Sequence, residues 1–396
     1  MPRVPAERPS VPQLFLAALK LGCTSFGGPV AHLGYFHRDY VERRRWIGEA
    51  QYADLVALCQ FLPGPASSQV GFGVGVLNRG LAGGIACWLG FTLPSAALLT
   101  GFAYGINALG QLTHAGWLDG LKVAAVAVVA QAVVAMWRSL CPDWPRSAVA
   151  ALIGGLVLLA TDAWSQVEGL VLGAAIGGLA LKSPRATPTA GEDPRGGRGT
   201  AWLAVFAALL LLLPVAVRIY PNGSLRVADC FYRVGALVFG GGHAVLPLLE
   251  RELVGPGWLT HDQFLAGYGA TQAVPGPLFT FAAYLGALLH VGPGGWIGAA
   301  WAVFWVFLPG LILVLGALPW WQRLRQLNSA QSALRGANAA VVGVLLAALI
   351  NPVALSGVTG WRHAVLAVAG FAALQFLRLP AWLLVLASAG AGALFL

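Results

Sequence analysis

Long apolar runs separated by short polar connections fill most of this chain. Each run approaches the ~20 residues that a helix needs to cross the hydrocarbon core of a bilayer. The pattern therefore predicts an all-α, polytopic membrane protein, a helical bundle with apolar runs at about 11–31, 83–106, 117–137, 147–161, 166–181, 201–217, 227–247, 296–318, 335–350, 361–377 and 380–396.

Two further apolar stretches, 52–79 and 264–292, are broken near their centres by Pro-Gly-Pro. Proline removes a backbone donor and disfavours helix at the residue before it, while glycine permits unusual dihedral angles. We therefore expect an interrupted or re-entrant helix in each stretch. In the first, one half-helix should end near Leu62 and the next begin near Pro65.

The two interruptions belong to a sequence repeat. Phe26-Gly27-Gly28 recurs 213 positions later, and Trp46 and the Gln-x-x-Pro-Gly-Pro motif recur 212 positions later. Duplicated halves with interrupted helices are typical of secondary transporters, which bind substrate where those helices meet. The predicted organisation is a first transporter repeat over 1–181, a linker with one apolar segment over 182–225, and a second repeat over 226–396.

The distribution of arginines indicates that the two repeats are inverted. The loop 37–50 carries four arginines, whereas its counterpart 250–262 has a net charge of −2. Cytoplasmic loops are enriched in basic residues, so the two loops are expected on opposite sides of the membrane. The apolar runs alone also permit parallel repeats, if both interrupted stretches are re-entrant hairpins.

Composition excludes a soluble protein. Hydrophobic residues make up 58% of the chain and charged residues 10%, where a soluble domain carries about 25% charged residues. The net charge of +9 is interpreted as a topology signal and not as nucleic-acid binding, since the basic residues gather at span ends. Five scattered cysteines, with no CxxC, indicate neither disulfides nor a metal site, and no cofactor is indicated.

The first interruption carries the chemistry that an anion needs. A helix start leaves its first amides unpaired at the positive end of the helix dipole, and such a start binds anions without a charged residue. Ser67-Ser68-Gln69 adds side-chain donors in the same turn, while the duplicate has only Thr280 between two phenylalanines. We expect the first repeat to supply more ligand contacts. The alternative is a simple kink whose serines bond to their own carbonyls.

The paired glycines are the second feature that both repeats share. Adjacent glycines destabilise a helix, so either a crossing helix or a substrate should approach the backbone there. His32 and His243 lie beside them and could carry a proton near neutral pH, or could be satisfied interfacial residues. Lys20, about mid-span, and Arg79 are further candidates because an intramembrane charge is costly.

The sequence indicates no catalytic residue, and all the candidate site residues are predicted to contact the substrate. The predicted substrate-binding residues are Lys20, Phe26, Gly27, Gly28, His32, Gln60, Pro63, Gly64, Pro65, Ser67, Ser68, Gln69, Arg79, Phe239, Gly240, Gly241, His243, Gln272, Pro275, Gly276, Pro277 and Thr280.

Several motifs together resemble the chromate ion transporter family, in its two-domain form. They are FGGPVAHLGYFHRDYVERRRW, CQFLPGPASSQVGFGVGVLNRGLAGG, Pro94-Ser95, FGGGHAVLPLLERELV and TQAVPGPLFTFAAYLG, and the resemblance spans nearly the whole chain. It implies a multi-pass inner-membrane transporter with two antiparallel halves that expels chromate and confers resistance. Chromate, with sulfate as the related oxyanion, and the bilayer are the implied partners; a homodimer is left open.

The residues by themselves lead only to an anion transporter, so other readings remain. Uptake or exchange of sulfate or another oxyanion is one. An intramembrane hydrolase using Ser67 or Ser68 is another, although neither serine lies in a GxSxG motif. A scaffold without flux is a third. The chain has no GxxxxGK[ST] phosphate loop, which favours secondary over ATP-driven transport.

Overall fold

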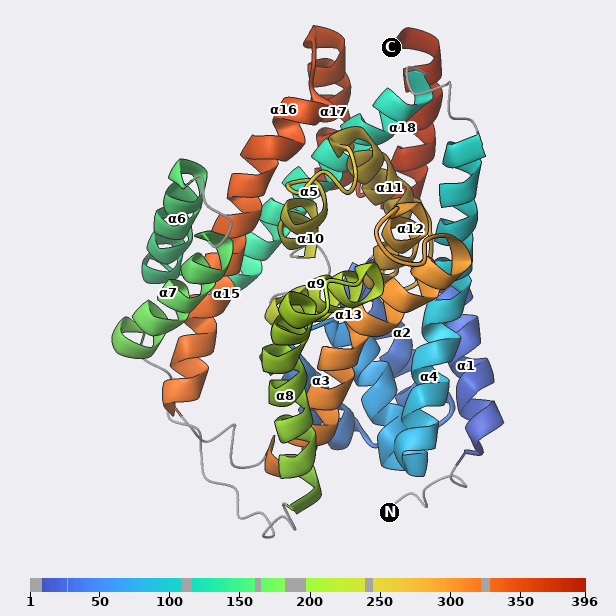
Figure 1. The fold of residues 1–396 in the computed structure, drawn as a ribbon, viewed down its shortest axis with the longest axis vertical. Coiled ribbons are helices and arrows are strands. Elements are labelled where there is room, and N and C mark those ends of the chain that lie inside the picture. The colour runs from blue at the N-terminus through green and yellow to red at the C-terminus, as the bar shows by residue number, and fades with distance from the viewer. Residues whose placement is uncertain are drawn as a thin grey trace. The chain divides into compact units, whose positions relative to one another are not determined.

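The computed structural model describes residues 9–26, 28–108, 116–160, 165–181, 197–238, 245–321 and 328–396. Within these ranges every regular element is a helix (Figure 1), which confirms the all-α prediction. Helices long and apolar enough to cross a membrane are Ala66–Ile106, Gly116–Leu140, Gly199–Ile219, Gly295–Trp320 and Gln331–Gly357. The protein is therefore a multi-pass membrane protein.

The helices form two compact units, and each unit draws segments from both predicted repeats. Unit 1 comprises Met1–Ala108, Gly197–Ala236 and Val274–Leu318, and unit 2 comprises Leu109–Gly196, Leu237–Ala273 and Pro319–Leu396. These limits describe packing, whereas the repeat limits at 181 and 226 describe duplication in the sequence. The division into repeats stays a prediction.

Unit 1 is organised around α4, which packs along α1. A second long helix, α13, packs along α8 and α12, and Figure 1 shows the yellow-green α8 beside the orange α13. The elements of this unit are α1 (Val11–Thr24), α2 (Gly28–Phe36), η1 (His37–Arg43), α3 (Glu49–Phe61), α4 (Ala66–Ala108), α8 (Gly197–Ile219), α9 (Gly223–Leu237), η3 (Leu278–Thr280), α12 (Phe281–Leu288) and α13 (Gly295–Ala317).

α8 shows most directly that lipid is the solvent. Its apolar span is 21 residues long, and only 6% of the most apolar part of that span is buried inside the protein. Leu213 packs against Tyr232 and Ala236 of α9, but Leu211 and Leu212 are exposed. A helix that is apolar on all sides and this exposed is stable only where lipid covers it.

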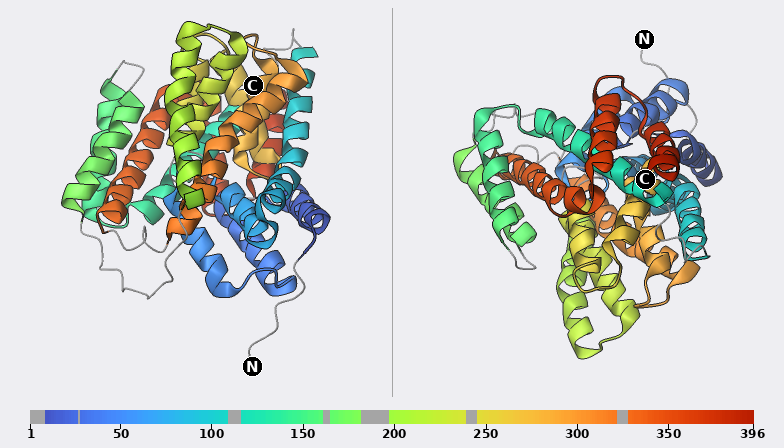
Figure 2. Two further views of the ribbon diagram at one scale, coloured as in Figure 1. Left: turned by 60° about the horizontal axis from the view of Figure 1, so that its bottom comes forward. Right: turned by 90° about the horizontal axis from the view of Figure 1, so that it is seen from above.

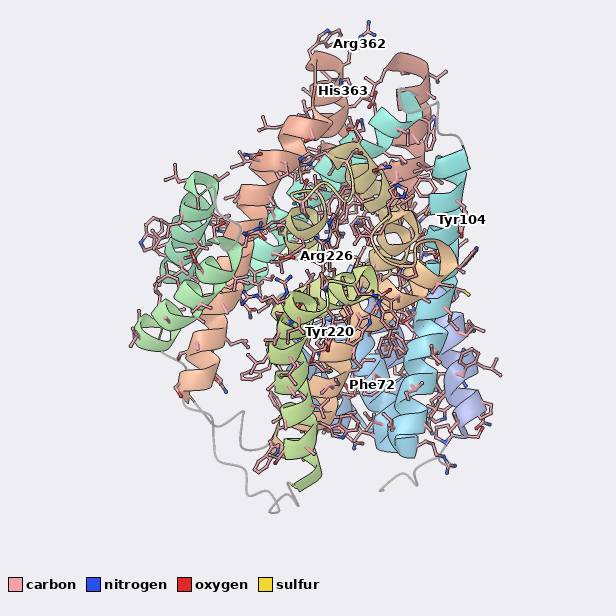
Figure 3. The ribbon with its side chains drawn as sticks, viewed as in Figure 1. Phe72, Tyr104, Tyr220, Arg226, Arg362 and His363 are labelled. Atoms are coloured by element: carbon pink, nitrogen blue, oxygen red, sulfur yellow. The ribbon has the colours of Figure 1, made fainter. Side chains whose placement is uncertain are left out.

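α4 consists of two arms. Its backbone leaves helical geometry at Arg79 and at Gly80, whose φ is +61°. The arms then approach each other closely, because a Cβ added at Gly84 would lie 2.8 Å from the ring of Phe72. Figure 3 labels Phe72 on the first arm and Tyr104 on the second, where the Tyr104 hydroxyl accepts a hydrogen bond from the Trp296 amide (3.2 Å).

Unit 2 is organised around α5 and α15. α15 packs against α6 and α7, and α5 packs against α17 and α18; Figure 2 shows the red C-terminal helices along the teal α5. The elements of this unit are α5 (Gly116–Leu140), α6 (Trp144–Leu159), α7 (Ser165–Ala180), α10 (Val245–Leu253), α11 (His261–Ala273), η4 (Leu318–Trp320, at its edge), α15 (Asn328–Ala348), η5 (Leu349–Ala354), α16 (Leu355–Gly357), α17 (Trp361–Gln375) and α18 (Ala381–Phe395).

Element boundaries follow the offset found in the sequence. α11 begins and ends 212 residues after α3, and α15 begins 212 residues after α5. Backbone angles agree at the same spacing: φ is +117° at Gly64 and +101° at Gly276, and +55° at Arg45 and +75° at Gly257. These helix boundaries and backbone angles therefore recur at the spacing of the sequence motifs. The orientation of the two repeats relative to a membrane stays a prediction.

Candidate anion site

The first interruption lies where the sequence pattern placed it. α3 ends at Phe61, and Leu62 is already extended, with φ −80° and ψ 148°. α4 begins at Ala66, and the Gln69 amide donates to the Pro65 carbonyl (2.9 Å). The amides that precede Gln69 in this first turn have no carbonyl one turn earlier to bond.

The side chains of this turn are buried and only partly satisfied. Ser67, Ser68 and Gln69 are exposed by 3%, 1% and 0%. The Gln69 amide nitrogen donates to the carbonyls of Pro63 (2.9 Å) and Gly310 (3.2 Å), which holds the interruption against α13. Within the described ranges, Ser68 Oγ and Gln69 Oε1 have no hydrogen-bond partner. Such a group costs roughly 1–3 kcal/mol to bury, so this turn is suited to a ligand.

His32 connects α2 to this turn. Its ring is 1% exposed, and Nδ1 lies 3.3 Å from Ser67 Oγ. The ring also stands edge-on to Phe91 of α4, at 5.3 Å between centroids. Its Nε2 has no partner in the part of the chain that the structure describes. His32 therefore offers a second polar atom close to the start of α4.

Two hydroxyls nearby were not predicted from the sequence. Ser25, at the end of α1, and Thr92, next to Phe91, are 0% and 3% exposed, and neither hydroxyl is partnered among the described residues. A lone serine or threonine in an apolar span normally bonds its own helix, as Thr100 does to the Ala96 carbonyl (2.7 Å). Nothing in the sequence distinguishes Ser25 and Thr92 from that common case.

The second interruption lies in the same unit and contacts the first repeat. The Gly276 amide donates to the Ser25 carbonyl (2.9 Å), and a Cβ added at Gly276 would lie 2.8 Å from Ser95 Oγ. A Cβ added at Gly64 would lie 3.1 Å from Gly310 Cα. Ser95 and Gly310 each follow the proline inside their helix. Each interruption therefore packs against the proline-containing helix of the other repeat.

The second interruption bonds its one hydroxyl internally. The Thr280 hydroxyl donates to the Pro277 carbonyl (2.7 Å), inside the short η3 turn. Of the two glutamines that precede the interruptions, Gln60 is exposed, whereas Gln272 is 9% exposed and its Nε2 has no partner in the described parts of the chain. The hydroxyls left for a ligand thus come from the first repeat.

Neither predicted intramembrane charge is brought to the interruption. Lys20 is exposed on α1. Arg79 is exposed at the turn of α4, where its Nε donates to the Pro9 carbonyl (2.7 Å); the 13 residues from Ala66 correspond to about 20 Å of helix. Phe26 is half-buried, and Gly28 has a φ of +80°. Five further candidates, Gly27, Phe239, Gly240, Gly241 and His243, lie outside the described residues.

Comparison with known proteins gives a consistent result. A family model described as chromate transporter matches residues 12–181 and 225–393. A chromate transport protein of Pseudomonas aeruginosa is 30% identical over 360 residues, or 86% of this chain and 81% of that protein. A probable chromate transport protein of Synechococcus elongatus is 28% identical, over 86% and 84%.

One shorter relative aligns over nearly its whole length with less than half of this chain. An uncharacterized transporter of Bacillus subtilis is 29% identical over 173 residues, which are 41% of this chain and 93% of that protein. No solved structure is significantly similar to the chain.

Proposed function

The chain belongs to the chromate transporter family, and from that premise we propose that it is a secondary transporter that exports chromate from the cytoplasm across the inner membrane. Its characterised relatives are named as transport proteins and not as enzymes. The observation that carries the proposal is the group of buried, unpartnered polar atoms at the start of α4.

In this proposal, neutral donors at the start of α4 hold the oxyanion. Ser68 Oγ and His32 Nε2, which have no partner among the described residues, donate to its oxygens. The backbone amides of a helix start and the positive end of the helix dipole add attraction. Gln69 Oε1 is an acceptor and suits a bridging water, while the Gln69 nitrogen holds the turn in place. No residue of this group carries a permanent charge, which suits a site that must also release its substrate.

Export of a dianion needs no nucleotide in a cell that is negative inside. Moving one charge through 100 mV is worth about 2.3 kcal/mol, so two charges supply roughly 4.6 kcal/mol. That energy supports an outward concentration ratio on the order of a thousandfold. The membrane potential is therefore a sufficient driving force.

Everted membrane vesicles containing the protein test this function. Respiring vesicles without ATP should accumulate chromate, and the accumulation should fall when a potassium ionophore with equal potassium collapses the potential. Vesicles from cells that lack the protein are the control. Accumulation equal to that control, or strict ATP dependence under an intact gradient, would refute the proposal.

Sulfate is a second candidate substrate. The donors at the start of α4 recognise charge and acceptor oxygens, and a sulfate dianion presents the same tetrahedral set. Radiolabelled sulfate flux in the same vesicles, with chromate as competitor, measures the preference. Sulfate flux that chromate does not inhibit would point to separate sites.

A further inference from the structure

Both repeats carry a histidine–glutamate pair at the same place, but with the two residues exchanged. In the first repeat, His37 Nε2 contacts the Glu49 carboxylate (2.8 Å). In the second, Glu250 Oε1 contacts His261 Nδ1 (2.9 Å). Glu250 follows His37 by 213 positions and His261 follows Glu49 by 212, the offsets of the flanking motifs. Each pair ties the start of the helix after the loop, α3 or α11, to the segment before the loop.

The surroundings of the two pairs differ sharply. The His37 and Glu49 side chains are 29% and 74% exposed, so water surrounds the first pair. The Glu250 side chain is only 5% exposed, while the His261 side chain is 45% exposed. Glu250 Oε2 also has no partner among the described residues. Because an ionised buried carboxylate is costly unless it is fully paired, burial favours the protonated form of Glu250.

Glu250 and His261 line a cavity of about 810 Å³ within unit 2. Gln166, Arg251 and Asn351 line the same cavity, and Gln166 Oε1 likewise has no partner in the described part of the chain. A cavity of this volume is large enough to admit water, and these side chains give that water polar partners. Glu250 therefore borders both the half-exposed His261 ring and the cavity, which are two routes by which a proton could reach it.

The charges around the pair favour proton exchange at Glu250. α10 and α11 are not among the candidate membrane spans. Burial raises the pKa of Glu250, and the hydrogen bond to Glu250 raises the pKa of His261. Asp262 acts on His261 in the same direction and also pairs with Lys122 (3.0 Å). Arg251 also lines the cavity, and the lining residues from α15 are Ala347 and Ala348.

We propose that the Glu250–His261 pair is a proton-binding site through which proton movement is coupled to oxyanion transport. The step is a simple protonation: the carboxylate takes one proton, delivered through the His261 imidazole or cavity water, and later returns it. The inference rests on the proposed transport function. It assigns the proton to Glu250 and His261 in place of the histidines predicted from the sequence, His32 and His243.

Chromate uptake into everted vesicles under a pH gradient, with the potential clamped at zero by ionophore and potassium, tests the coupling. The variant Glu250→Gln keeps the shape of the side chain and removes the titrating group. The matched control is Glu49→Gln, the same change in the exposed pair. Because chromate itself binds a proton near neutrality, all variants are compared at the same pH values.

We expect Glu250→Gln to lose the uptake driven by the pH gradient and to keep the uptake driven by the potential. Glu49→Gln should keep both. Glu250→Asp, which retains a carboxyl group, should keep the gradient-driven uptake with a shifted pH midpoint, and this arm remains informative if Glu250→Gln is poorly folded. A dye inside the vesicles that reports pH should show chromate-dependent proton movement in the wild type and in Glu49→Gln, and none in Glu250→Gln.

Three outcomes would overturn the assignment. Gradient-driven uptake in Glu250→Gln equal to wild type would show that the carboxyl is not used. Loss of potential-driven uptake in folded Glu250→Gln would place the residue in anion handling. A wild-type protein with potential-driven uptake but no response to the pH gradient would remove the coupling while leaving the proposed function intact. Absence of all chromate uptake would instead refute the proposed function.

Discussion

Removing the hydroxyl at each interruption in turn separates the effect on ligand binding from the effect on folding. In Ser68→Ala, the lost hydroxyl has no protein partner in the described structure, so no internal hydrogen bond is broken. A hydrogen bond to a charged ligand is worth about 1.5–3 kcal/mol, and each 1.4 kcal/mol is tenfold in affinity. We therefore expect the Kd for chromate to rise by roughly 10- to 150-fold. The free energy of unfolding should not fall.

Thr280→Val is the matched counterpart. It removes only the hydroxyl that donates to the Pro277 carbonyl (2.7 Å), which costs about 0.5–1.5 kcal/mol of stability. The Kd for chromate should stay unchanged, because that hydroxyl is already occupied within its own turn. Equilibrium dialysis with radiolabelled chromate measures the Kd, and denaturation in detergent measures stability. Wild-type affinity in Ser68→Ala, or equal losses of affinity in both variants, would refute the assignment of binding to the first repeat.

Two further predictions concern the backbone and the topology. Gly64→Val should abolish export while the protein stays in the membrane fraction, because a side chain at φ +117° costs about 1–3 kcal/mol and its Cβ would press on α13. The control is Gly101→Ala, where a Cβ meets nothing within 4 Å. Export by Gly64→Val at the native rate would contradict the argument. The topology is tested in a protein whose exposed Cys23 is replaced by serine. Single cysteines placed at Arg44 and at Pro256 should react with a membrane-impermeant thiol reagent from opposite faces of the membrane. Reaction from the same face would contradict inverted repeats.

Local chemistry explains what the sequence predicted well. The Pro-Gly-Pro motifs place the break because proline and glycine act on their own backbone, and the structure ends α3 at Phe61 and starts α4 at Ala66. Apolar run length likewise depends only on neighbours along the chain. Helix existence and helix interruption are therefore readable without knowledge of packing.

Packing decides the rest. Lys20 was a candidate because it lies about mid-span, but α1 buries the face formed by Leu14, Ala17, Ala18 and Leu21, and Lys20 projects off that face. The sequence cannot show which side of an apolar helix will be covered. The histidine–glutamate pairs were not found by comparing the repeats for a different reason. Identical residues reveal a repeat in the sequence, whereas at these positions the residue types are exchanged and only the contact between them is kept.

The interleaving of the two compact units constrains how the protein can be made. Unit 1 contains α1 near the N-terminus but is completed only by α13, which ends at Ala317, and unit 2 is completed only by the last helices. Neither unit can close while the ribosome is still translating the first repeat, so the early helices must wait in the membrane with incomplete packing. Contacts this distant along the chain also slow folding. A nascent chain released in the linker after residue 181 would contain no complete unit, and it would be a substrate for membrane quality control.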